Sequence, residues 1–330
     1  MKNIGLVGLG FIGKTHLEAY QHMENAQVKA IYTRKGGDDD GVGTTYPFVE
    51  EYEDLLANKD IDIVDICLPT FLHEEYILKA ANAGKHIICE KPLTLTVDSA
   101  LRILQEVNRK QVRLFVGNVL RFWPEYELIK SYSESDLLKD IELVHAKRLG
   151  QVPAWSNWFQ FPEKSGGALF DLHIHDIDFV SFLLGKVESV YAVGTKNSYG
   201  AWDHVMTTLT FQNQSKAFVE ASQRMPNGYP FTMTFRAQTS QSVLDLHIKA
   251  GENIEHRNNS DHQFWYYTHQ KKVPITLDSS DAFQKELSYF VNCIEKGEEN
   301  HVIPNEEVLY TLQLLEAIER SLETKSVIRL

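Results

Sequence analysis

The sequence predicts an α/β protein in which a doubly wound parallel sheet is followed by a second α/β region of mainly antiparallel strands. Short apolar segments alternate with helical ones through the first third of the chain, and longer stretches of alternating apolar and polar residues then replace them. A length of 330 residues also exceeds what one hydrophobic core usually serves. We therefore expect two domains, over residues 1–120 and 121–330.

The N-terminal region has the rhythm of repeated β-α units. The nearly continuous apolar run over residues 61–68 is typical of a parallel strand covered on both faces. Gly84 follows a helical segment in the manner of a C-terminal cap. We expect strands at residues 3–7, 28–33, 61–68, 86–90 and 114–117, and helices at residues 15–23, 50–58, 74–83 and 98–110.

Beyond about residue 122 the hydrophobic period changes to two. This period indicates strands with one buried face, which are typical of an antiparallel sheet. Two helices are expected to close the chain, at residues 282–296 and 306–323. The residues predicted to face the core are Val205, Thr207, Leu209, Phe211, Ala217, Val219, Ala221, Phe231, Met233 and Phe235.

The charge balance argues against polyanionic partners. The chain has 33 basic and 45 acidic residues, a formal net charge of -12, which repels nucleic acid and anionic membranes. An anionic ligand must therefore be captured locally, by backbone N–H groups or a few placed cations. We expect a small-molecule substrate and neither a nucleic-acid nor a membrane partner.

The cysteines suggest neither disulfides nor a metal site. Cys67, Cys89 and Cys293 are odd in number, far apart and lack a C-x-x-C pair. The chain opens without a secretion signal, and none of its apolar runs approaches membrane-spanning length. We expect a soluble protein of the reducing cytoplasm.

Residues 8–13 form a glycine-rich turn of the pattern G-x-G-x-x-G between a predicted strand and a predicted helix. Gly8 suits the tight turn, Gly10 lets the backbone approach a pyrophosphate, and Gly13 lets the helix pack on the strand. The context predicts a Rossmann dinucleotide-binding domain, and a merely structural turn is the alternative. The helix N-terminus would bind the anion in spite of the negative net charge.

The end of the second predicted strand bears on the choice of cofactor. A carboxylate that accepts the ribose hydroxyls is usual there, but this chain has Thr33, Arg34 and Lys35. A hydroxyl and two cations can accommodate a 2′-phosphate, so we favour NADP over NAD. Alternatively, Arg34 and Lys35 are solvated loop charges and either cofactor binds.

Three further segments resemble the Gfo/Idh/MocA oxidoreductase family in order and spacing. They are Ile-Cys-Leu-Pro-Thr at residues 66–70 followed by His73, Glu-Lys-Pro at residues 90–92, and Gly-Gly-Ala-Leu-Phe-Asp at residues 166–171 followed by His175 and Asp178. The resemblance covers essentially the whole chain. It implies a Rossmann domain, an α/β domain with a large open sheet, and a homodimer or homotetramer formed through that sheet. It also implies that a sugar or cyclitol hydroxyl is oxidised, or the ketone reduced.

The resemblance also implies residue roles. Lys91 would touch both the nicotinamide ribose and the reacting oxygen, Asp171 would bind or orient the substrate, and His175 would exchange the proton. With the glycine-rich turn, the predicted cofactor contacts are Gly8, Gly10, Phe11, Ile12, Gly13, Thr33, Arg34, Leu68, Pro69, Thr70, His73, Glu90 and Lys91. The predicted substrate contacts are Lys91, Arg121, Asn157, Trp158, Asp171 and His175, with Trp155 in the same segment.

The chemistry of the residues agrees with those roles. Hydride leaves a carbinol carbon only if the hydroxyl proton leaves as well, and histidine titrates in the range that this step requires. On a regular α-helix Asp171, His175 and Asp178 would share one face. A carboxylate beside an imidazole stabilises the imidazolium, and Lys91 supplies a cation where negative charge develops on oxygen.

Duller explanations exist for each of these residues. Lys91 could be a surface lysine, His175 a core histidine, Asp171 a carboxylate at a helix N-terminus, and Arg121 part of a salt bridge. The tryptophans could be ordinary core aromatics. His173 stands where a small residue is frequent, and its role could be packing or substrate contact. His173 and His175 would point apart on a helix, so we expect no metal site.

Two other functions compete with a dehydrogenase. An NAD-dependent glycosidase of the same fold would hold its cofactor tightly and oxidise the sugar only transiently. A non-catalytic dinucleotide sensor is the third alternative, and the presence of Lys91, Asp171 and His175 together argues against it. Fold alone does not decide among them.

Overall fold

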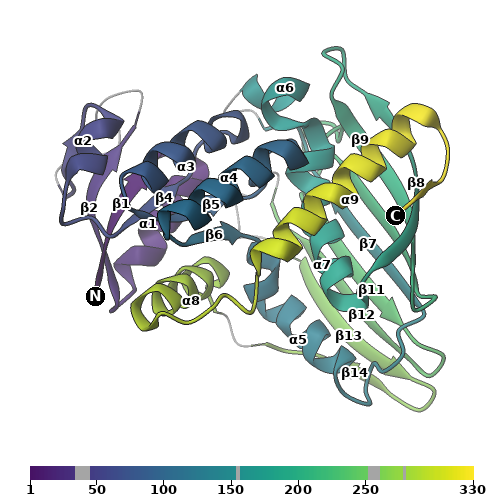
Figure 1. The fold of residues 1–330 in the computed structure, drawn as a ribbon. Coiled ribbons are helices and arrows are strands. Elements are labelled where there is room, and N and C mark those ends of the chain that lie inside the picture. Colours follow the sequence, from purple (N-terminus) through teal and green to yellow (C-terminus); the bar gives the residue numbers. More distant parts are fainter. Residues whose placement is uncertain (34–44, 154–156, 252–260, 278–279) are drawn as a thin grey trace. The chain divides into compact units, whose positions relative to one another are not determined.

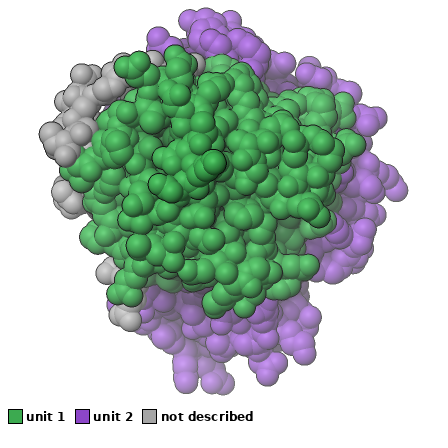
Figure 2. Space-filling view, turned by 60° about the vertical axis from the view of Figure 1, so that its left-hand side comes forward, with its two compact units in different colours: residues 1–123, 280–310 green, residues 124–279, 311–330 purple. Residues whose placement is uncertain are grey.

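The computed structural model describes residues 1–33, 45–153, 157–251, 261–277 and 280–330. Its contacts divide the chain into two compact units, coloured separately in Figure 2. Unit 1 comprises residues 1–123 and 280–310, and unit 2 comprises residues 124–279 and 311–330. The sequence predicts two consecutive domains, residues 1–120 and 121–330, whereas unit 1 also includes residues 280–310. The reason is that the apolar face of helix 282–296 packs against residues of unit 1.

Unit 1 is built on a six-stranded parallel sheet, which confirms the predicted doubly wound fold. The strand order is β3-β2-β1-β4-β5-β6, the order usual for dinucleotide-binding folds. β4 and β6 are buried along their whole length, as their mainly apolar sequences predict. The strands are β1 (Lys2–Val7), β2 (Ala26–Tyr32), β3 (Phe48–Val49), β4 (Ile63–Ile66), β5 (His86–Glu90) and β6 (Leu114–Gly117).

The helices of unit 1 begin and end at residues that suit those positions. Thr96 caps the N-terminus of α4 by accepting from the backbone N–H of Ser99, and Gly84 takes a positive φ of 72° just after α3. α1 begins at Phe11, within the glycine-rich segment 8–13 and four residues earlier than predicted. The helices are α1 (Phe11–Gln21), α2 (Tyr52–Ala57), α3 (His73–Asn82), α4 (Val97–Lys110) and α8 (Ala282–Lys296), with short turns η2 (Thr70–Leu72) and η3 (Val119–Phe122).

α8 joins unit 1 through its apolar face. It packs against α1 and η3, and the Phe290 ring lies 5.0 Å from that of Phe115 on β6. Phe290 and Leu287 are completely buried. Asp281 caps this helix by accepting from the backbone N–H of Gln284. The hydrophobic effect therefore places α8 on the parallel sheet, although Ala282 and Phe290 follow Trp123 by 159 and 167 positions.

Unit 2 is built on a nine-stranded open sheet of order β14-β13-β12-β11-β7-β10-β9-β8-β15. All its described strand pairs are antiparallel except β7 with β10, which confirms a mainly antiparallel sheet. The ten residues predicted to face the core are all buried. The strands are β7 (Leu143–Leu149), β8 (Val187–Lys196), β9 (Trp202–Phe211), β10 (Lys216–Ser222), β11 (Thr232–Gln238), β12 (Ser242–Lys249), β13 (Asp261–Thr268), β14 (Lys272–Pro274) and β15 (Ile328–Arg329).

Helices cover one face of this sheet, where α5, α7 and the second half of α9 lie side by side (Figure 1). Tyr126, Phe179 and Phe235 form edge-to-face contacts there, with ring centroids 4.7 to 5.7 Å apart. No helix among the described residues is long and apolar enough to cross a membrane. The helices are α5 (Pro124–Ser133), α6 (Pro162–Ser165), α7 (Ile174–Leu184) and α9 (Asn305–Thr324), with η4 (Asn157–Gln160) and a π-helical turn η5 (Leu169–His173).

Candidate active site

In unit 1 the predicted cofactor residues follow the carboxyl ends of neighbouring strands. Val7 at the end of β1 pairs with Ile66 at the end of β4, and Ile66 pairs with Cys89 near the end of β5. The glycine-rich turn, residues 67–70 and residues 90–91 therefore leave the sheet at one edge. In open α/β sheets this edge, beside the strand where the order reverses, is where ligands bind.

The three glycines of the turn differ in what surrounds them. Gly8 has a φ of +95°, and a Cβ there would lie 2.5 Å from the carbonyl oxygen of Cys67. A Cβ at Gly13 would overlap the carbonyl oxygen of Gly8, whereas a Cβ at Gly10 would meet no atom within 4 Å. The first and third glycines thus allow close packing inside the protein, and the second borders open space. No acidic residue lies in the first turn of α1, so the residues present fit a dinucleotide pyrophosphate at this helix N-terminus.

The other predicted cofactor residues differ in exposure. Thr33, Leu68 and Pro69 are partly exposed, and Thr70 is buried. Arg34 lies outside the described residues, as does Lys35.

His73 is also buried, and its ring lies between two loops. Its Nε2 is 2.8 Å from the carbonyl oxygen of Leu68, and its Nδ1 is 3.0 Å from that of Pro92. Burial lowers the pKa of His73 below its usual value. The neutral ring donates to one of these two carbonyls at a time. His73 thereby holds the loop after β4 to the loop after β5.

Lys91 is partly exposed and follows a buried carboxylate, Glu90. The Oε2 atom of Glu90 accepts a hydrogen bond from the backbone N–H of Lys91, at 3.2 Å. A Cβ at Gly117 on the neighbouring strand would lie 2.9 Å from Glu90 Oε1. Because Gly117 has no side chain, the Glu90 carboxylate has room beside β6.

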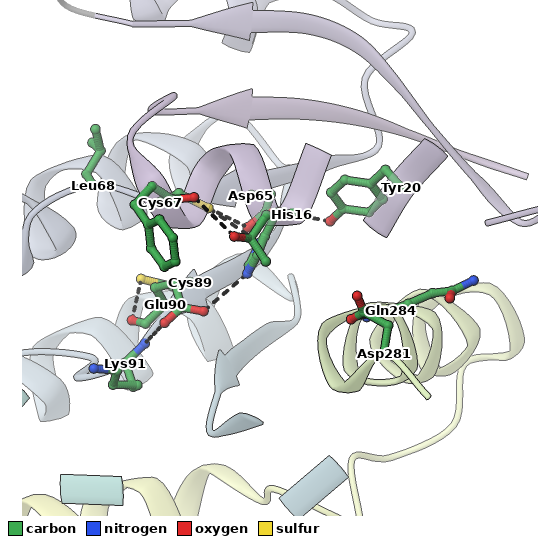
Figure 3. Close-up of polar contacts among 12 residues, drawn as sticks. His16, Tyr20, Asp65, Cys67, Leu68, Cys89, Glu90, Lys91, Asp281 and Gln284 are labelled. Atoms are coloured by element: carbon green, nitrogen blue, oxygen red, sulfur yellow. Dashed lines mark hydrogen bonds and ion pairs between the residues drawn. The ribbon is translucent and has the colours of Figure 1, made fainter. Parts of the chain in front are cut away.

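A buried group of ionisable residues connects α1, β4 and the end of β5 (Figure 3). Sequence reasoning did not predict it. His16 on α1 is 1% exposed, with Nδ1 2.8 Å from Asp65 Oδ2 and Nε2 3.2 Å from Glu90 Oε1. The Tyr20 hydroxyl donates to the same Asp65 oxygen at 3.0 Å, and the Cys67 sulfur is 3.4 Å from His16 Nδ1. We call these five residues the His16 cluster.

The charges in the His16 cluster follow from its contacts. Burial lowers the pKa of His16, but interactions with Cys67 and Asp65 outweigh burial and raise it well above 6.5. Burial also raises the pKa of Cys67, to about 12. The raised pKa favours the imidazolium form of His16, whose two ring nitrogens face the side chains of Asp65 and Glu90.

His16, Asp65 and Cys67 also bring three potential metal-ligand atoms within 4.8 Å of one another. The His16–Asp65 contact of 2.8 Å is instead that of a charge-assisted hydrogen bond, in which a proton occupies the space between the two atoms. We therefore interpret this group as a hydrogen-bond network.

In unit 2, Asp171 and His175 are partly exposed, and every other residue from Ala168 to Val180 is buried. Asp171 lies in the π-helical turn η5 and His175 in the first turn of α7. Two polar side chains four residues apart thus reach the surface of an otherwise buried helical segment. π-helical turns inside helices are frequent at functional sites.

Asp178 does not share this exposed face, which corrects the expectation. It is 1% exposed, and its Oδ1 accepts from the Thr311 hydroxyl at 3.1 Å. The prediction assumed a regular α-helix, whereas the wider π turn of η5 changes the rotation between residues 171 and 178.

Buried polar contacts fix this segment on both sides of His175. Arg148 of β7 makes a bidentate ion pair with Asp176, with Nε–Oδ2 and Nη2–Oδ1 distances of 3.0 and 3.2 Å. His173 Nε2 is 2.8 Å from the Thr207 hydroxyl of β9. His173 is completely buried, and burial lowers its pKa to about 3, so its neutral ring packs in the core.

Asp171 also has a partner that sequence reasoning missed. The buried Gln223, just after β10, donates from Nε2 to Asp171 Oδ2 at 2.6 Å. This contact orients the carboxylate. No local motif could have indicated it, because 52 residues separate the two side chains.

The remaining predicted substrate residues divide into two kinds. Arg121 is buried in η3, and its Nη1 donates to the carbonyl oxygen of Val302, at 2.7 Å, and to Glu307. The Arg121–Glu307 ion pair corresponds to the salt bridge that was considered as an alternative to substrate contact. Asn157 is exposed at the start of η4, and Trp158 is partly exposed and stacks on Phe159. Trp155 lies outside the described residues.

Comparison with known proteins agrees with both halves of this description. Residues 2–118 match an oxidoreductase family with an NAD-binding Rossmann fold, and residues 126–245 match the Gfo/Idh/MocA C-terminal domain. An uncharacterised oxidoreductase YrbE of Bacillus subtilis is 32% identical over 68% of each chain. The chain belongs to the Gfo/Idh/MocA oxidoreductase family. It is an NAD(P)-dependent oxidoreductase, and the predicted family, fold and enzyme class are confirmed.

Other members of the Gfo/Idh/MocA family match over nearly the full length. Inositol 2-dehydrogenase of Rhizobium meliloti is 28% identical over 97% of both chains, and D-xylose 1-dehydrogenase (NADP(+)) 2 of Haloferax volcanii is 28% identical over 99% of both. A crystal structure of a putative myo-inositol dehydrogenase from Sinorhizobium meliloti has a TM-score of 0.82 at 26% identity, covering 100% of this chain and 99% of that one. A putative NADPH-dependent oxidoreductase from Desulfitobacterium hafniense has a TM-score of 0.87 at 22% identity, covering 99% and 97%.

Proposed function

We propose that the enzyme transfers hydride between a nicotinamide cofactor and a hydroxyl or ketone carbon of a sugar, cyclitol or related hydroxy compound, using Lys91, Asp171 and His175. The observation that carries the proposal is the isolated exposure of Asp171 and His175 on a buried helical segment. Buried polar contacts fix that segment, so both side chains start from a rigid base. The relatives named as inositol and xylose dehydrogenases support a polyhydroxylated substrate.

Each residue has a distinct part in the proposed reaction. The bound nicotinamide supplies the hydride acceptor or donor at the reacting carbon. In oxidation, His175 accepts the hydroxyl proton while the carbon–oxygen double bond forms, and in reduction it returns the proton. Asp171 orients the substrate and stabilises the imidazolium, and the Lys91 ammonium stabilises negative charge on the substrate oxygen.

The burial and hydrogen bonds of the other predicted site residues suggest a part for each of them. The turn around Gly10, with Phe11, Ile12, Thr33, Leu68 and Pro69, is proposed to contact the cofactor. His73 and Glu90 are buried, and their proposed part is to hold the Leu68, Pro92 and Lys91 backbone. Asn157 and Trp158 remain proposed substrate contacts, and Arg121 is assigned to its ion pair.

The test is turnover of a panel of sugars, cyclitols and their keto forms with NAD and NADP. Lys91→Ala and His175→Ala should each lower kcat by about 10² or more while dinucleotide binding persists. His247→Ala, an exposed histidine on β12, is the control and should behave as wild type. Wild-type activity in either site variant would remove that residue from the mechanism, and no turnover of any panel member would contradict the proposed reaction.

Cofactor placement can be tested with two alanines in one turn. At Gly10 the methyl group meets no protein atom, so stability should be retained while dinucleotide affinity falls by about tenfold or more. At Gly13 the methyl group would overlap backbone, so the protein itself should be destabilised. Unchanged affinity in Gly10→Ala would contradict the placement.

We also propose a preference for NADP over NAD. Its support is the hydroxyl of Thr33 at the end of β2, followed by two cations in the sequence, where NAD enzymes usually have a carboxylate. Thr33→Asp should move kcat/KM toward NAD. A wild-type kcat/KM that is higher for NAD than for NADP would overturn the preference.

A homodimer or homotetramer through the C-terminal sheet is proposed as well. Tyr191 and Phe218 lie in one row across β8, β9 and β10, and Val193 and Met206 lie in the next row, on the face opposite the helices. The four side chains are 40% to 46% exposed, a grouping that favours association. Light scattering should give a multiple of 37.8 kDa that Met206→Arg lowers and Leu101→Arg, on α4, leaves unchanged. A monomeric wild type would refute the proposal.

A cytoplasmic location is proposed from the three free cysteines and would be checked by cell fractionation.

A further inference from the structure

The proposed mechanism does not use His16, although it is the central residue of the His16 cluster. It lies on α1 three residues after the last glycine of the turn. Its two ring nitrogens face two different carboxylates, Asp65 and Glu90. Both nitrogens can donate at once only in the imidazolium form. His16 is therefore a buried cation that ties α1 to β4 on one side and to β5 on the other.

The contact with Glu90 continues to Lys91. One oxygen of Glu90 accepts from His16, and the other accepts from the backbone N–H of Lys91. Glu90 is 6% exposed, and the close approach of Gly117 leaves its carboxylate little room to turn. A shift of the Glu90 carboxylate would therefore be transmitted to the point from which the Lys91 side chain starts.

We propose that His16 is a positioning residue for Lys91, acting through the Glu90 carboxylate. Helix α1, which begins at the nucleotide-binding turn, then sets the position of the lysine as well as that of the pyrophosphate. The inference rests on the proposed function of Lys91. His16 is 1% exposed, so its proposed effect on the reaction is indirect.

Two substitutions separate the two contacts of His16. His16→Gln can place an amide N–H near the former Nε2 and keep the donor to Glu90. His16→Asn can place one near the former Nδ1 and keep the donor to Asp65. We expect kcat to fall by about tenfold or more in His16→Asn and by less than about threefold in His16→Gln, with the KM for the dinucleotide changed little in both, because small misplacements of a catalytic group have large effects on rate.

The matched pair excludes a merely structural role. If His16 only stabilises the fold, the two variants should lose thermal stability without a difference in kcat between them. Equal kcat values in the two folded variants, or a loss confined to the KM for the dinucleotide, would overturn the proposal.

A double-mutant cycle provides the second test, and its Glu90→Gln variant stands alone even if His16→Asn folds poorly. Glu90→Gln should lower kcat by about tenfold, and His16→Asn added to it should cause no additional loss, because the two residues act in series. Wild-type kcat in Glu90→Gln would overturn the inference. The proposed function fails separately, if Lys91→Ala keeps wild-type turnover.

Discussion

Each of the two units contains a candidate catalytic residue that directly follows or precedes a buried carboxylate. In unit 1 the pair is Glu90 and Lys91, and in unit 2 it is His175 and Asp176. Both carboxylates are ion-paired within their own unit, Glu90 with His16 and Asp176 with Arg148. In both units, an ion-paired buried carboxylate thus fixes the backbone next to a partly exposed candidate catalytic side chain.

The two ion pairs differ in their cations. A guanidinium stays charged at every pH at which the protein is folded, and the bidentate geometry of Arg148 fixes the Asp176 carboxylate in two directions. An imidazolium can lose its proton, so the contact of His16 with Glu90 depends on pH. The ion pair beside His175 therefore keeps its cation at every such pH, whereas the ion pair beside Lys91 is lost when His16 loses its proton.

The largest effect is expected when the permanent pair is broken. Arg148→Met leaves the Asp176 carboxylate buried without its cation, and the free energy of unfolding should fall by about 3–5 kcal/mol. Urea denaturation measures this change. The double variant Arg148→Met/Asp176→Leu removes both charges and should recover much of the loss.

An exposed ion pair provides the control for that experiment. Arg102 on α4 pairs with Glu74 at 2.6 Å, but its side chain is 59% exposed. Arg102→Ala should therefore change the free energy of unfolding by less than about 1 kcal/mol. A similar small change in Arg148→Met would refute the idea that the buried pair supports α7.

A smaller effect is expected from His173, the neutral histidine of unit 2. Its pKa is about 3 when folded and near 6.5 when unfolded, so between these values only the unfolded state binds the proton. Stability should fall as pH decreases below 6.5, by about 2 kcal/mol at pH 5. His173→Asn should show a flatter pH dependence of the free energy of unfolding between pH 5 and 6.5, and an unchanged slope would contradict this assignment.

His16 should act in the opposite direction and more weakly over the usual assay range. Its folded pKa is raised above 6.5, so its stabilisation is complete below pH 6.5 and decreases as pH rises toward the folded value. The decrease cannot exceed about 1.4 kcal/mol per pH unit. The difference in the free energy of unfolding between wild type and His16→Gln should shrink from pH 6.5 to 7.5. A constant difference would contradict a His16 pKa that is raised in the folded state.

Local patterns predicted most of the fold. The period of two correctly placed the buried face of β9, β10 and β11, and the β-α rhythm correctly placed β5 and β6. The first of the two closing helices was expected at residues 282–296, which are the bounds of α8. The start of α1 and the π turn of η5 escaped prediction, because each depends on backbone geometry rather than on side-chain periodicity. Assignment of α8 to unit 1 depends on tertiary packing, which no local pattern encodes.

The site was predictable only where a motif carries the chemistry. Gly10, Lys91 and His175 stand in short motifs. Gln223 and Arg148 act on residues 52 and 28 positions away, so their partners become visible only when the sheet has formed. His16 followed a recognised turn, but nothing in the sequence indicated that its ring points inward to Asp65 and Glu90.

The late position of α8 in the chain has a consequence for biosynthesis. The parallel sheet lacks one of its apolar covers until residues 282–296 leave the ribosome, after nearly nine-tenths of the chain has been synthesised. Until then the surface around Phe115 is open to water and to other nascent chains. We therefore expect a fragment that ends at Trp123 to aggregate, and the parallel sheet to complete its core only when synthesis is almost finished.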